Sequence, residues 1–399
     1  MSQTANNTVV LAFSGGLDTS YCVKYLAIER GLTVHTAIVN TGGFSVEELA
    51  RIEQKAYALG VASHTTLDKT EAFYQQCVKY LLFGNILRNQ TYPLSVSAER
   101  MFQALAIAEY AKQLGAAYIA HGSTGAGNDQ VRFDLAFQVL VPEVQILTPI
   151  REQRLSREAE IAYLQAHGVH DNWEKAAYSI NQGLWGTSVG GRETLTSRQV
   201  LPDAAYPTPL TQTEPRTVAL HWQQGELVGL DEQRFDSPVE AIQALQALAQ
   251  PYGIGRDIHV GDTIIGIKGR VGFEAAAPLI LIKAHHLLEK HTLTKWQQHW
   301  KEQLANWYGM MLHEALFLDP VMRNIESFLT DTQTRVSGTV WVQLHPHRFV
   351  LEGIESPYDL MQSSFGQYGE MNSAWSGEDV KGFTKILANQ LKIYQSLQK

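Results

Sequence analysis

Short apolar runs alternate with amphipathic stretches through residues 1–172 of the chain. The run at 9–13 precedes a stretch whose apolar positions recur at helical spacing, and a second run at 32–39 precedes a capping box that begins at Ser45. We expect further strands at 61–67, 116–120 and 147–150. Strand and helix patterns that alternate through short links predict a parallel sheet with helices on both faces, whose ligands bind beyond the carboxyl ends of the strands.

The alternation stops at residue 173, where we place the start of a second domain that extends to residue 365. Strand patterns dominate this region, and the strands are expected at 217–222, 226–230, 262–268, 335–344 and 348–353. Helical patterns interrupt them at 237–249 and 295–317. These patterns predict a domain in which strands and helices are mixed.

The helix expected at 295–317 carries an aromatic stripe. Its apolar residues recur at spacings of three and four, which is typical of the buried face of a helix rather than of a cofactor site. The stripe consists of Trp296, Trp300, Leu304, Trp307 and Met311.

The last segment, residues 366–399, ends in an amphipathic helical pattern. One stripe of that helix consists of Val380, Phe383, Leu387, Leu391 and Tyr394. A terminal helix with such a stripe must cover an apolar surface. We therefore expect it to pack on another subunit, with docking on its own domain as the alternative.

Composition narrows the class of protein. The 399 residues carry a formal net charge of −8, which argues against a general nucleic-acid-binding surface. The two cysteines cannot build a disulfide framework, and a reducing compartment is the simplest inference. No apolar run reaches the roughly 18 residues of a membrane span. We therefore expect a soluble cytoplasmic protein with no membrane or nucleic-acid partner.

The sequence Ser-Gly-Gly-Leu-Asp-Thr-Ser at 14–20 lies between the first predicted strand and the first predicted helix. Paired glycines let backbone N–H groups approach a ligand, and a helix N-terminus adds unpaired donors, so phosphate is the expected ligand. The lysine of a Walker A loop and the spacing of a dinucleotide-binding fingerprint are both missing. Because Asp18 would face phosphate, the loop requires Mg²⁺ between the two negative groups.

The second informative stretch is 121–133, in which three glycines are interleaved with hydroxyl, amide, carboxylate and guanidinium groups. So many functional groups exceed what a polar turn needs, and we expect them to bind a ligand. The planar fork of Arg132 suits a carboxylate or a phosphate, and Asp129 suits an ammonium group. Together they fit an amino-acid substrate.

Three stretches resemble, in order and spacing, the signatures of the argininosuccinate synthase family within the N-type ATP pyrophosphatases. They are 10–20, 121–133, and 178–181 with Leu184, Trp185 and Ser188. The resemblance implies an α/β fold with a Rossmann-like parallel-sheet nucleotide-binding domain, an α+β synthetase domain and a C-terminal oligomerisation helix. It also implies ATP- and Mg²⁺-dependent ligation of citrulline and aspartate through a citrullyl-adenylate, with release of AMP and pyrophosphate, by a cytosolic homotetramer of arginine biosynthesis.

The resemblance also assigns residues to the three substrates. It implies that ATP contacts Ala12, Phe13, Ser14, Gly15, Gly16, Leu17, Asp18, Thr19, Ser20, Val39 and Gly122. It implies that aspartate contacts Thr124, Asn128 and Asp129, and that citrulline contacts Tyr92, Ser97, Asn128, Arg132, Ser179 and Ser188. Ser14 and Asp18 would position phosphate, with Asp18 near Mg²⁺. No side chain stands out as an obligatory nucleophile.

Two positions depart from the family pattern. Gly261 stands where the family has a citrulline-contacting glutamate, with Asp262 next to it as an alternative acid, and Phe273 stands where the family has a tyrosine. Loss of an acid that pairs with the α-ammonium group would weaken selection for free citrulline. A secondary hypothesis is therefore that the substrate is an Nα-acylated citrulline.

Two other classes of function remain open. A related ligase that adenylates a tRNA base shares the 14–20 loop. That function calls for a basic surface and usually a reactive cysteine, and the net negative charge of the chain and the positions of its two cysteines argue against it. A sensor without turnover is favoured only by Gly261 and Phe273.

Overall fold

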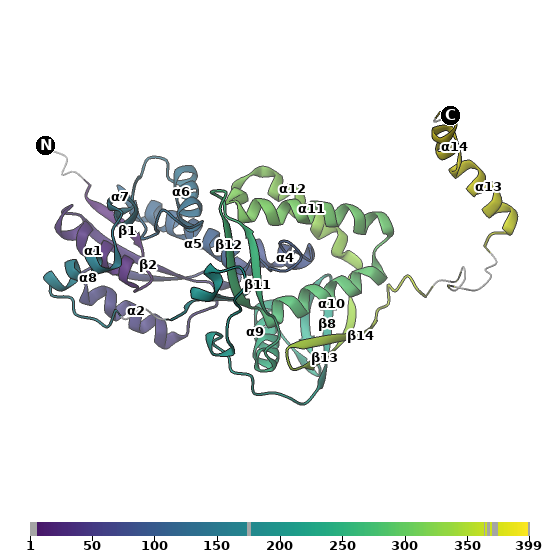
Figure 1. The fold of residues 1–399 in the computed structure, drawn as a ribbon, viewed down its shortest axis with the longest axis horizontal. Coiled ribbons are helices and arrows are strands. Elements are labelled where there is room, and N and C mark those ends of the chain that lie inside the picture. The colour runs from purple at the N-terminus through teal and green to yellow at the C-terminus, as the bar shows by residue number, and fades with distance from the viewer. Residues whose placement is uncertain (1–5, 174–176, 363, 365–367, 369–373, 398–399) are drawn as a thin grey trace.

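The computed structural model describes residues 6–173, 177–362, 364, 368 and 374–397 (Figure 1). Its first part is a five-stranded, wholly parallel sheet in the order β3-β2-β1-β4-β5, which confirms the predicted α/β class. The strands are β1 Thr8–Ala12, β2 Thr33–Asn40, β3 Ser63–Asp68, β4 Tyr118–Ala120 and β5 Gln145–Leu147. The helices are α1 Leu17–Ile28, α2 Val46–Ala58, α5 Ser95–Leu114, α6 Asp129–Leu140, α7 Pro149–Gln153 and α8 Arg157–Ala166.

Both faces of this sheet are buried. Val9 and Leu11 of β1 pack into a cluster with α1 and α8, whereas Val10 points to the opposite cluster, which includes α5. Successive side chains of a strand alternate between faces, so a strand covered on both sides is apolar throughout. The order of the strands reverses at β1, which lies between β2 and β4. Such a reversal creates a crevice at the carboxyl ends of β1 and β4.

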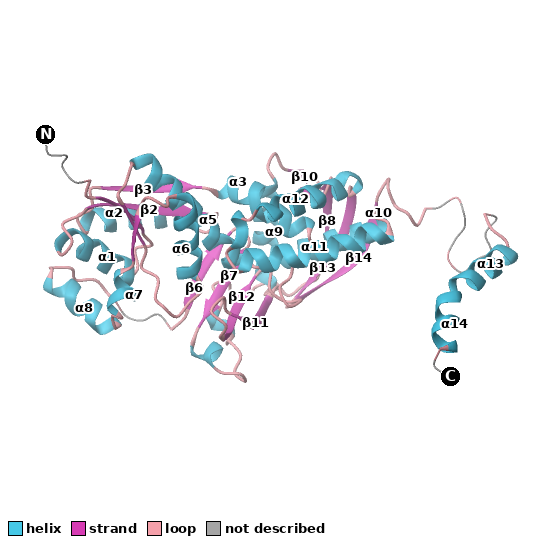
Figure 2. Ribbon diagram, turned by 90° about the horizontal axis from the view of Figure 1, so that it is seen from above, coloured by secondary structure: helices cyan, strands magenta, loops and turns pink. Residues whose placement is uncertain are grey.

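The second part contains two antiparallel sheets. One has the order β10-β9-β8-β13-β14. The other has the order β11-β12-β7-β6 and lies between the parallel sheet and the β10-β9-β8-β13-β14 sheet (Figure 2). The strands are β6 Ser179–Gly183, β7 Gly186–Gly190, β8 Arg216–Gln223, β9 Glu226–Leu230, β10 Gln233–Arg234, β11 Arg256–Asp262, β12 Lys268–Glu274, β13 Gly338–His345 and β14 Arg348–Glu355. The helices are α9 Pro238–Ala249, α10 Ala276–Thr292, α11 Lys295–His313 and α12 Pro320–Thr332.

The segment between β3 and α5 begins with a helix that has an irregular middle. The predicted helix after β3 forms as α3 Thr70–Phe73, a π-helical turn at Tyr74–Val78, and α4 Lys79–Phe83. Short 3₁₀ turns occur at Arg192–Leu195, Asp203–Ala205, Gln250–Tyr252, Leu316–Leu318 and Gln333–Arg335.

Several local predictions are wrong. The strand expected at 147–150 lies at 145–147 instead, and Pro149 begins helix α7. Residues 262–268 are not a strand but mainly the turn between β11 and β12, closed by a hydrogen bond from the Thr263 amide to the Ile267 carbonyl of 2.8 Å. Helix α10 was missed because its apolar residues form nearly continuous runs, which carry no helical period. Helix α12, which Asp319 caps, was missed as well.

The predicted burial of the aromatic stripe on α11 is wrong for its three tryptophans, whereas Leu304 and Met311 are partly buried against the core. Trp296, Trp300 and Trp307 are 63%, 56% and 59% exposed. The inward side of α11 carries the polar anchors Lys301 and Tyr308, whose hydroxyl donates to Glu326 at 3.0 Å. These buried polar contacts fix the rotation of the helix and leave the tryptophans on the outside.

The C-terminal stripe is amphipathic as predicted but touches little of this chain. Helices α13 Gly377–Leu387 and α14 Asn389–Ser396 contain no buried residue. Figure 1 shows both helices well apart from the rest of the molecule. The alternative that this segment docks on its own domain is therefore not what the structure shows.

A buried carboxylate holds the second part together. Glu289 of α10 accepts hydrogen bonds from Lys301 of α11 and from Gln333, both at 2.8 Å, and from Asn85. Glu289 and Lys301 are each 2% exposed. Burial alone would raise the pKa of Glu289, but Lys301, His285 and the hydrogen bonds hold that pKa below its usual value. The cluster thus fixes α10 against α11 and the loop after α4.

We predict that Lys301→Met lowers the free energy of unfolding by about 3–5 kcal/mol, because it leaves the Glu289 charge buried without a cation. Urea titration would measure the loss. Lys283→Met, which removes an exposed lysine of α10, is the matched control. A loss no larger than that of the control would contradict the role of the pair.

The same carboxylate predicts acid sensitivity. A carboxyl whose pKa is depressed in the folded state adds stability above its unfolded pKa, and that stability is lost as the pH falls through the folded value. We therefore expect the stability advantage of wild type over Glu289→Gln to shrink as the pH falls from 7 to 3. Urea titrations at several pH values would check this, and an advantage that grows toward pH 3 would contradict it.

Candidate functional site

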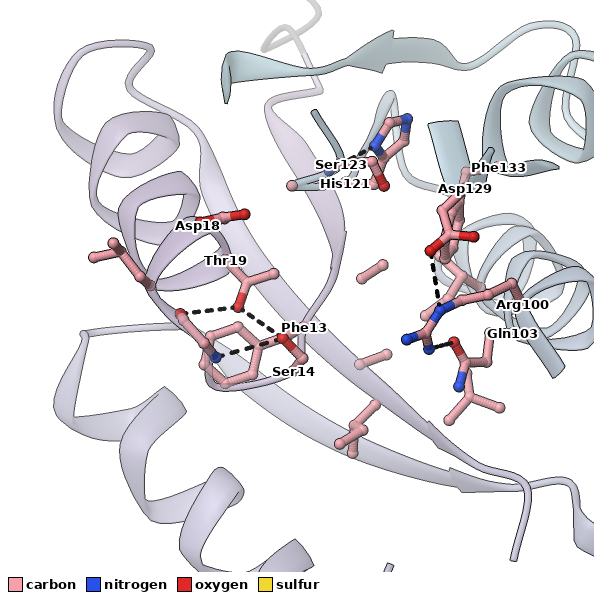
Figure 3. A pocket seen from close by; sticks show the side chains of 18 of the residues that line it. Phe13, Ser14, Asp18, Thr19, Arg100, Gln103, His121, Ser123, Asp129 and Phe133 are labelled. Atoms are coloured by element: carbon pink, nitrogen blue, oxygen red, sulfur yellow. Dashed lines mark hydrogen bonds and ion pairs between the residues drawn. The ribbon is translucent and has the colours of Figure 1, made fainter. Parts of the chain in front are cut away.

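A cavity of about 360 Å³ opens at the carboxyl ends of β1, β2 and β4, where the sheet predicts a ligand (Figure 3). It brings together residues from the two stretches that the sequence singled out. The predicted site residues that line it are Ala12, Phe13, Ser14, Gly16, Leu17, Asp18, Thr19, Val39, Gly122 and Asp129.

The loop after β1 presents the start of α1 to this cavity. Gly15 has a φ of +75°, which glycine adopts without strain, and no side chain caps α1 at Gly16. The hydroxyls of Ser14 and Thr19 lie 3.3 Å apart on the rim of the loop. An uncapped helix start flanked by hydroxyl groups is suited to hold an anion.

Two predicted ATP residues lie behind the loop rather than in the cavity. The hydroxyl of Ser20 donates to the carbonyl of Gly16 at 2.8 Å and is fully buried. A side chain at Gly15 would point toward Ile52 of α2, at 3.4 Å. In the structure both residues shape the loop.

Asp18 lies beside a second carboxyl group. Burial and the negative charge of Asp18 raise the pKa of Glu160, on α8, to about 8. One carboxyl oxygen of Glu160 is buried and has no hydrogen-bond partner among the described residues. A cation near this pair would relieve the repulsion, so the residues fit a Mg²⁺ ion held mainly through phosphate oxygens.

The loop after β4 closely approaches the loop at 14–20, on which the sequence predicts phosphate and which we call the phosphate loop. A Cβ at Gly122 would lie 3.2 Å from the methyl group of Thr19, so glycine suits this contact. The neighbouring His121 is 1% exposed, and its Nε2 donates to Asp134 at 2.9 Å while its Nδ1 accepts from the Ser123 amide. These two bonds set the tautomer of the ring and hold the loop in place.

The second stretch becomes the first turn of α6, where Asp129 meets two arginines. Arg132 donates from Nη1 to Asp129 at 2.9 Å, and Arg100 of α5 donates from Nε to the other Asp129 oxygen at 3.3 Å. Arg132 is 2% exposed, whereas Asp129 and Arg100 line the cavity. Figure 3 shows Asp129 and Arg100 across the cavity from Ser14 and Thr19.

Arg132 also connects α5 and α6 to the end of α11. Its Nη2 donates to the Ser97 hydroxyl at 3.1 Å and to the His313 carbonyl at 3.0 Å. The Nε2 of His313 donates to the Asp262 carbonyl, and its Nδ1 accepts from the Ser97 hydroxyl at 3.1 Å. Burial and the charge of Arg132 lower the pKa of His313 to about 3, so the ring is neutral at neutral pH.

One face of the β6-β7-β12-β11 sheet packs toward α5, next to the cavity but not among the residues that line it. We call this face the wall. Asn181 pairs with Ser188, and Ser188 pairs with Phe273. Residues directly opposite in antiparallel strands point to the same face, and so do residues two apart along a strand. The predicted citrulline residues Ser179 and Ser188 therefore share this face with Asn181, Phe273, His259 and Gly261.

Side chains join this wall to α5. Arg100 donates from Nη2 to the Asn181 side chain, and the Asn181 amide reaches the Ser188 hydroxyl at 3.5 Å. Trp185, in the hairpin turn, donates to the Pro93 carbonyl at 3.0 Å. Ser188 is 4% exposed, whereas Ser179 is exposed at the start of β6.

Tyr92 is part of this wall through its ring. It stacks on His259 with ring centroids 5.2 Å apart and lies 5.4 Å from Phe273. Its hydroxyl accepts hydrogen bonds from Ser95 and the Val96 amide, at the first turn of α5. These two hydrogen bonds hold the first turn of α5 in place.

Two predicted aspartate residues lie at the edge of the site. Thr124 is exposed in the loop before α6. The Asn128 side-chain oxygen accepts from the Ile264 amide at 2.8 Å, which joins this loop to the β11–β12 turn. Neither residue lines the cavity, although both flank Asp129.

Sequence reasoning missed several residues that line the cavity. They are Ala37, Ile38, Phe44, Arg100, Gln103, Ile107 and Arg157. His121, Ser123 and Phe133, which the sequence placed in the 121–133 stretch without a role of their own, also line the cavity. Arg100 and Gln103 lie one turn apart on α5 and are linked by a hydrogen bond of 2.6 Å. The signal available in the sequence was a charged pair, Glu99 and Arg100, within a helix start of small and apolar residues.

Comparison with known proteins covers both parts of the chain. The model of the "Arginosuccinate synthase N-terminal HUP domain" matches residues 8–170, and that of the "Arginosuccinate synthase C-terminal domain" matches residues 178–394. The chain is 36% identical to the argininosuccinate synthase of Xanthomonas campestris, over 99% of this chain and 100% of the relative. Identity to the Dictyoglomus thermophilum enzyme is 36%, over 97% of each chain. Identity to the Methanocaldococcus jannaschii enzyme is 33%, over 98% of each chain. The chain therefore belongs to the argininosuccinate synthase family.

Proposed function

We propose that this protein joins a citrulline to aspartate at the expense of ATP, and that it releases AMP and pyrophosphate. One observation carries the proposal: a single cavity has the phosphate loop on one wall and the Asp129–Arg100 pair on the other. The first wall suits a triphosphate, and the second suits a zwitterionic amino acid. Family membership supports the same reaction.

The proposed assignment of substrates follows the resemblance to the family. ATP lies on residues 12–20, Val39 and Gly122, with its phosphates at the start of α1. Aspartate lies on Thr124, Asn128 and Asp129, at the mouth of the site. Citrulline lies on a further set of residues, which are Tyr92, Ser97, Asn128, Arg132, Ser179 and Ser188.

The reaction requires two displacements. The ureido oxygen of citrulline attacks the α-phosphorus of ATP, and the bond to pyrophosphate breaks, which leaves a citrullyl-adenylate. The aspartate amine then attacks the ureido carbon and loses its proton, and AMP departs. Ser14, Thr19 and the amides at the start of α1 stabilise the charge that develops on pyrophosphate, while Arg100 and Arg132 keep Asp129 in place.

Mg²⁺ is the ion that this site fits. Asp18 and Glu160 would hold it together with phosphate oxygens, and it would supply charge neutralisation for the departing pyrophosphate. Among the described residues no group of three or more acidic, histidine or cysteine side chains could form a complete metal site. Such a sparse donor set is consistent with an ion that arrives on the nucleotide.

The burial of the two cysteines argues against the alternative function, a ligase that adenylates a tRNA base. Cys22 and Cys77 are both free and 0% exposed, and burial raises the pKa of each thiol. A buried thiol with a raised pKa is a poor sulfur carrier. A sensor without turnover would bind the same ligands but release no pyrophosphate, so the assay below separates it from the enzyme.

We expect pyrophosphate release from ATP to require a citrulline substrate, and argininosuccinate-type product to require aspartate as well. Asp18→Asn should reduce the rate by about 100-fold or more, because a developing charge loses its counter-ion site. Circular dichroism would show that the fold is kept. Asp236→Asn, at an exposed carboxylate of the second part, is the matched control. Release that needs neither amino acid, or full activity of Asp18→Asn, would contradict the proposal.

We also propose a cytoplasmic homotetramer with domains at 1–172 and 173–365 and a C-terminal arm at 366–399. No helix within the described residues is both long and apolar enough to cross a membrane. Phe383, Leu387 and Leu391 are 65%, 64% and 70% exposed. An amphipathic arm that leaves the body with its apolar stripe uncovered supports packing on a second copy of the chain.

We predict that the triple variant Phe383→Ser, Leu387→Ser, Leu391→Ser lowers the assembly state, because it removes the apolar stripe of the arm. Size-exclusion chromatography with light scattering would measure the mass. The matched control is Lys381→Gln with Lys385→Gln, on the same helix. An unchanged mass for the triple variant, or a monomeric wild type, would contradict self-association through the arm.

A further inference from the structure

The phosphate loop has no positive side chain of its own. Residues 14–20 contain no lysine or arginine, and their one charged group, Asp18, is negative. The start of a helix supplies only about half of a positive charge. A triphosphate carries several negative charges, and further charge builds up on its β-phosphate when pyrophosphate leaves. A cationic side chain from another element is therefore expected at this end of the cavity.

Only two arginines, and no lysine, are among the described residues that line the cavity. They are Arg100 and Arg157. Arg100 is already committed, because it donates to Asp129 at 3.3 Å and also to the side chains of Gln103 and Asn181. Arg157 has no carboxylate within ion-pair distance among the described residues, and its Nη2 donates to a backbone carbonyl. Arg157 is therefore the cation of the cavity that is still available to an anion.

Helix α8 brings Arg157 beside the phosphate loop. This helix packs against α1, which follows the loop. Arg157 is the first residue of α8, and Glu160, one turn further on, lies next to Asp18. Burial and the negative charge of Asp18 raise the pKa of Glu160 to about 8, so at neutral pH this carboxyl group is mostly protonated and leaves the charge of Arg157 in place. Arg157 thus lies at the end of the cavity where the phosphates are expected.

The segment after α8 holds the guanidinium group in position. The carbonyl that accepts from Nη2 of Arg157 is that of Trp173. The Lys55 ammonium lies 4.3 Å from the centre of the Trp173 ring and pairs with Asp171 at 2.6 Å, so Lys55 is itself committed. A neutral carbonyl orients Arg157 without neutralising it, and no described residue accepts a hydrogen bond from its Nε or Nη1. An oriented, uncompensated guanidinium group of this kind is suited to bind phosphate.

Building on the proposed function, we propose that Arg157 binds the β- and γ-phosphates of ATP and stabilises the departing pyrophosphate. As the ureido oxygen forms its bond to the α-phosphorus, the bond from that phosphorus to the bridging oxygen breaks, and the electron pair stays on pyrophosphate. The guanidinium group donates to the oxygens on which this charge builds up. Arg157 is thus a catalytic residue that supplies the positive charge missing from the phosphate loop.

The two products separate this role from others, because pyrophosphate contains the β- and γ-phosphates and AMP does not. We expect Arg157→Gln to lower kcat by about 100-fold or more and to raise the inhibition constant of pyrophosphate by about tenfold or more. Inhibition by AMP should stay as in wild type. Arg157→Lys keeps the charge but lacks the planar fork, so its values should fall in between. Arg154→Gln, at an exposed arginine just before α8, is the matched control.

Calorimetric titration of each variant with pyrophosphate and with AMP checks the same constants without turnover, and circular dichroism shows whether the fold is kept. Wild-type affinity for pyrophosphate in folded Arg157→Gln would overturn the proposal and leave the proposed function intact. A higher KM for aspartate or citrulline at unchanged pyrophosphate affinity would also overturn it, because Arg157 would then serve a substrate carboxylate. If Arg157→Gln does not fold, Arg157→Lys decides by the same comparison. No pyrophosphate release by the wild type would overturn the proposed function itself.

Discussion

The buried guanidinium of Arg132 is the contact on which the geometry of the site depends. It is 2% exposed and joins three helices, through Asp129 on α6, Ser97 on α5 and the carbonyl of His313 on α11. A buried charge is tolerated only when such partners surround it. The contacts that stabilise the buried charge therefore also fix the position of Asp129, which faces the 14–20 loop across the cavity.

The two parts of the chain meet beside the cavity. The parallel sheet carries the 14–20 loop at its strand reversal, whereas the β6-β7-β12-β11 sheet packs against α5, and none of its residues is among those that line the cavity. Close backbone approach joins them: a Cβ at Gly43 would lie 1.8 Å from the carbonyl oxygen of Gln182, and the Leu184 amide donates to the Thr41 carbonyl at 3.1 Å. The predicted citrulline residues thus lie where the two parts meet, as ligand sites often do.

Amphipathic patterns predicted helices more reliably than they predicted contacts. The stripe on α11 and the stripe on α13 and α14 were both recognised, yet Trp300 and Leu391 are 56% and 70% exposed. A periodic apolar face shows that a helix can cover a surface, but the partner surface lies elsewhere in the chain or in another copy. On α11 the buried Lys301–Glu289 pair, which no apolar period announces, decided the orientation.

The sequence by itself determined the parallel sheet and the glycine-rich turn at 14–20, because strand–helix alternation and paired glycines act over a few residues. Only the tertiary structure decided the surroundings of the predicted citrulline residues. Ser97 and His313 are 216 positions apart, and no local pattern predicts their hydrogen bond. The same holds for His259, whose ring fills the space beside Gly261 because Tyr92 stacks on it from another part of the chain. Long-range packing sets these charges and contacts, so they become visible only once the chain is folded.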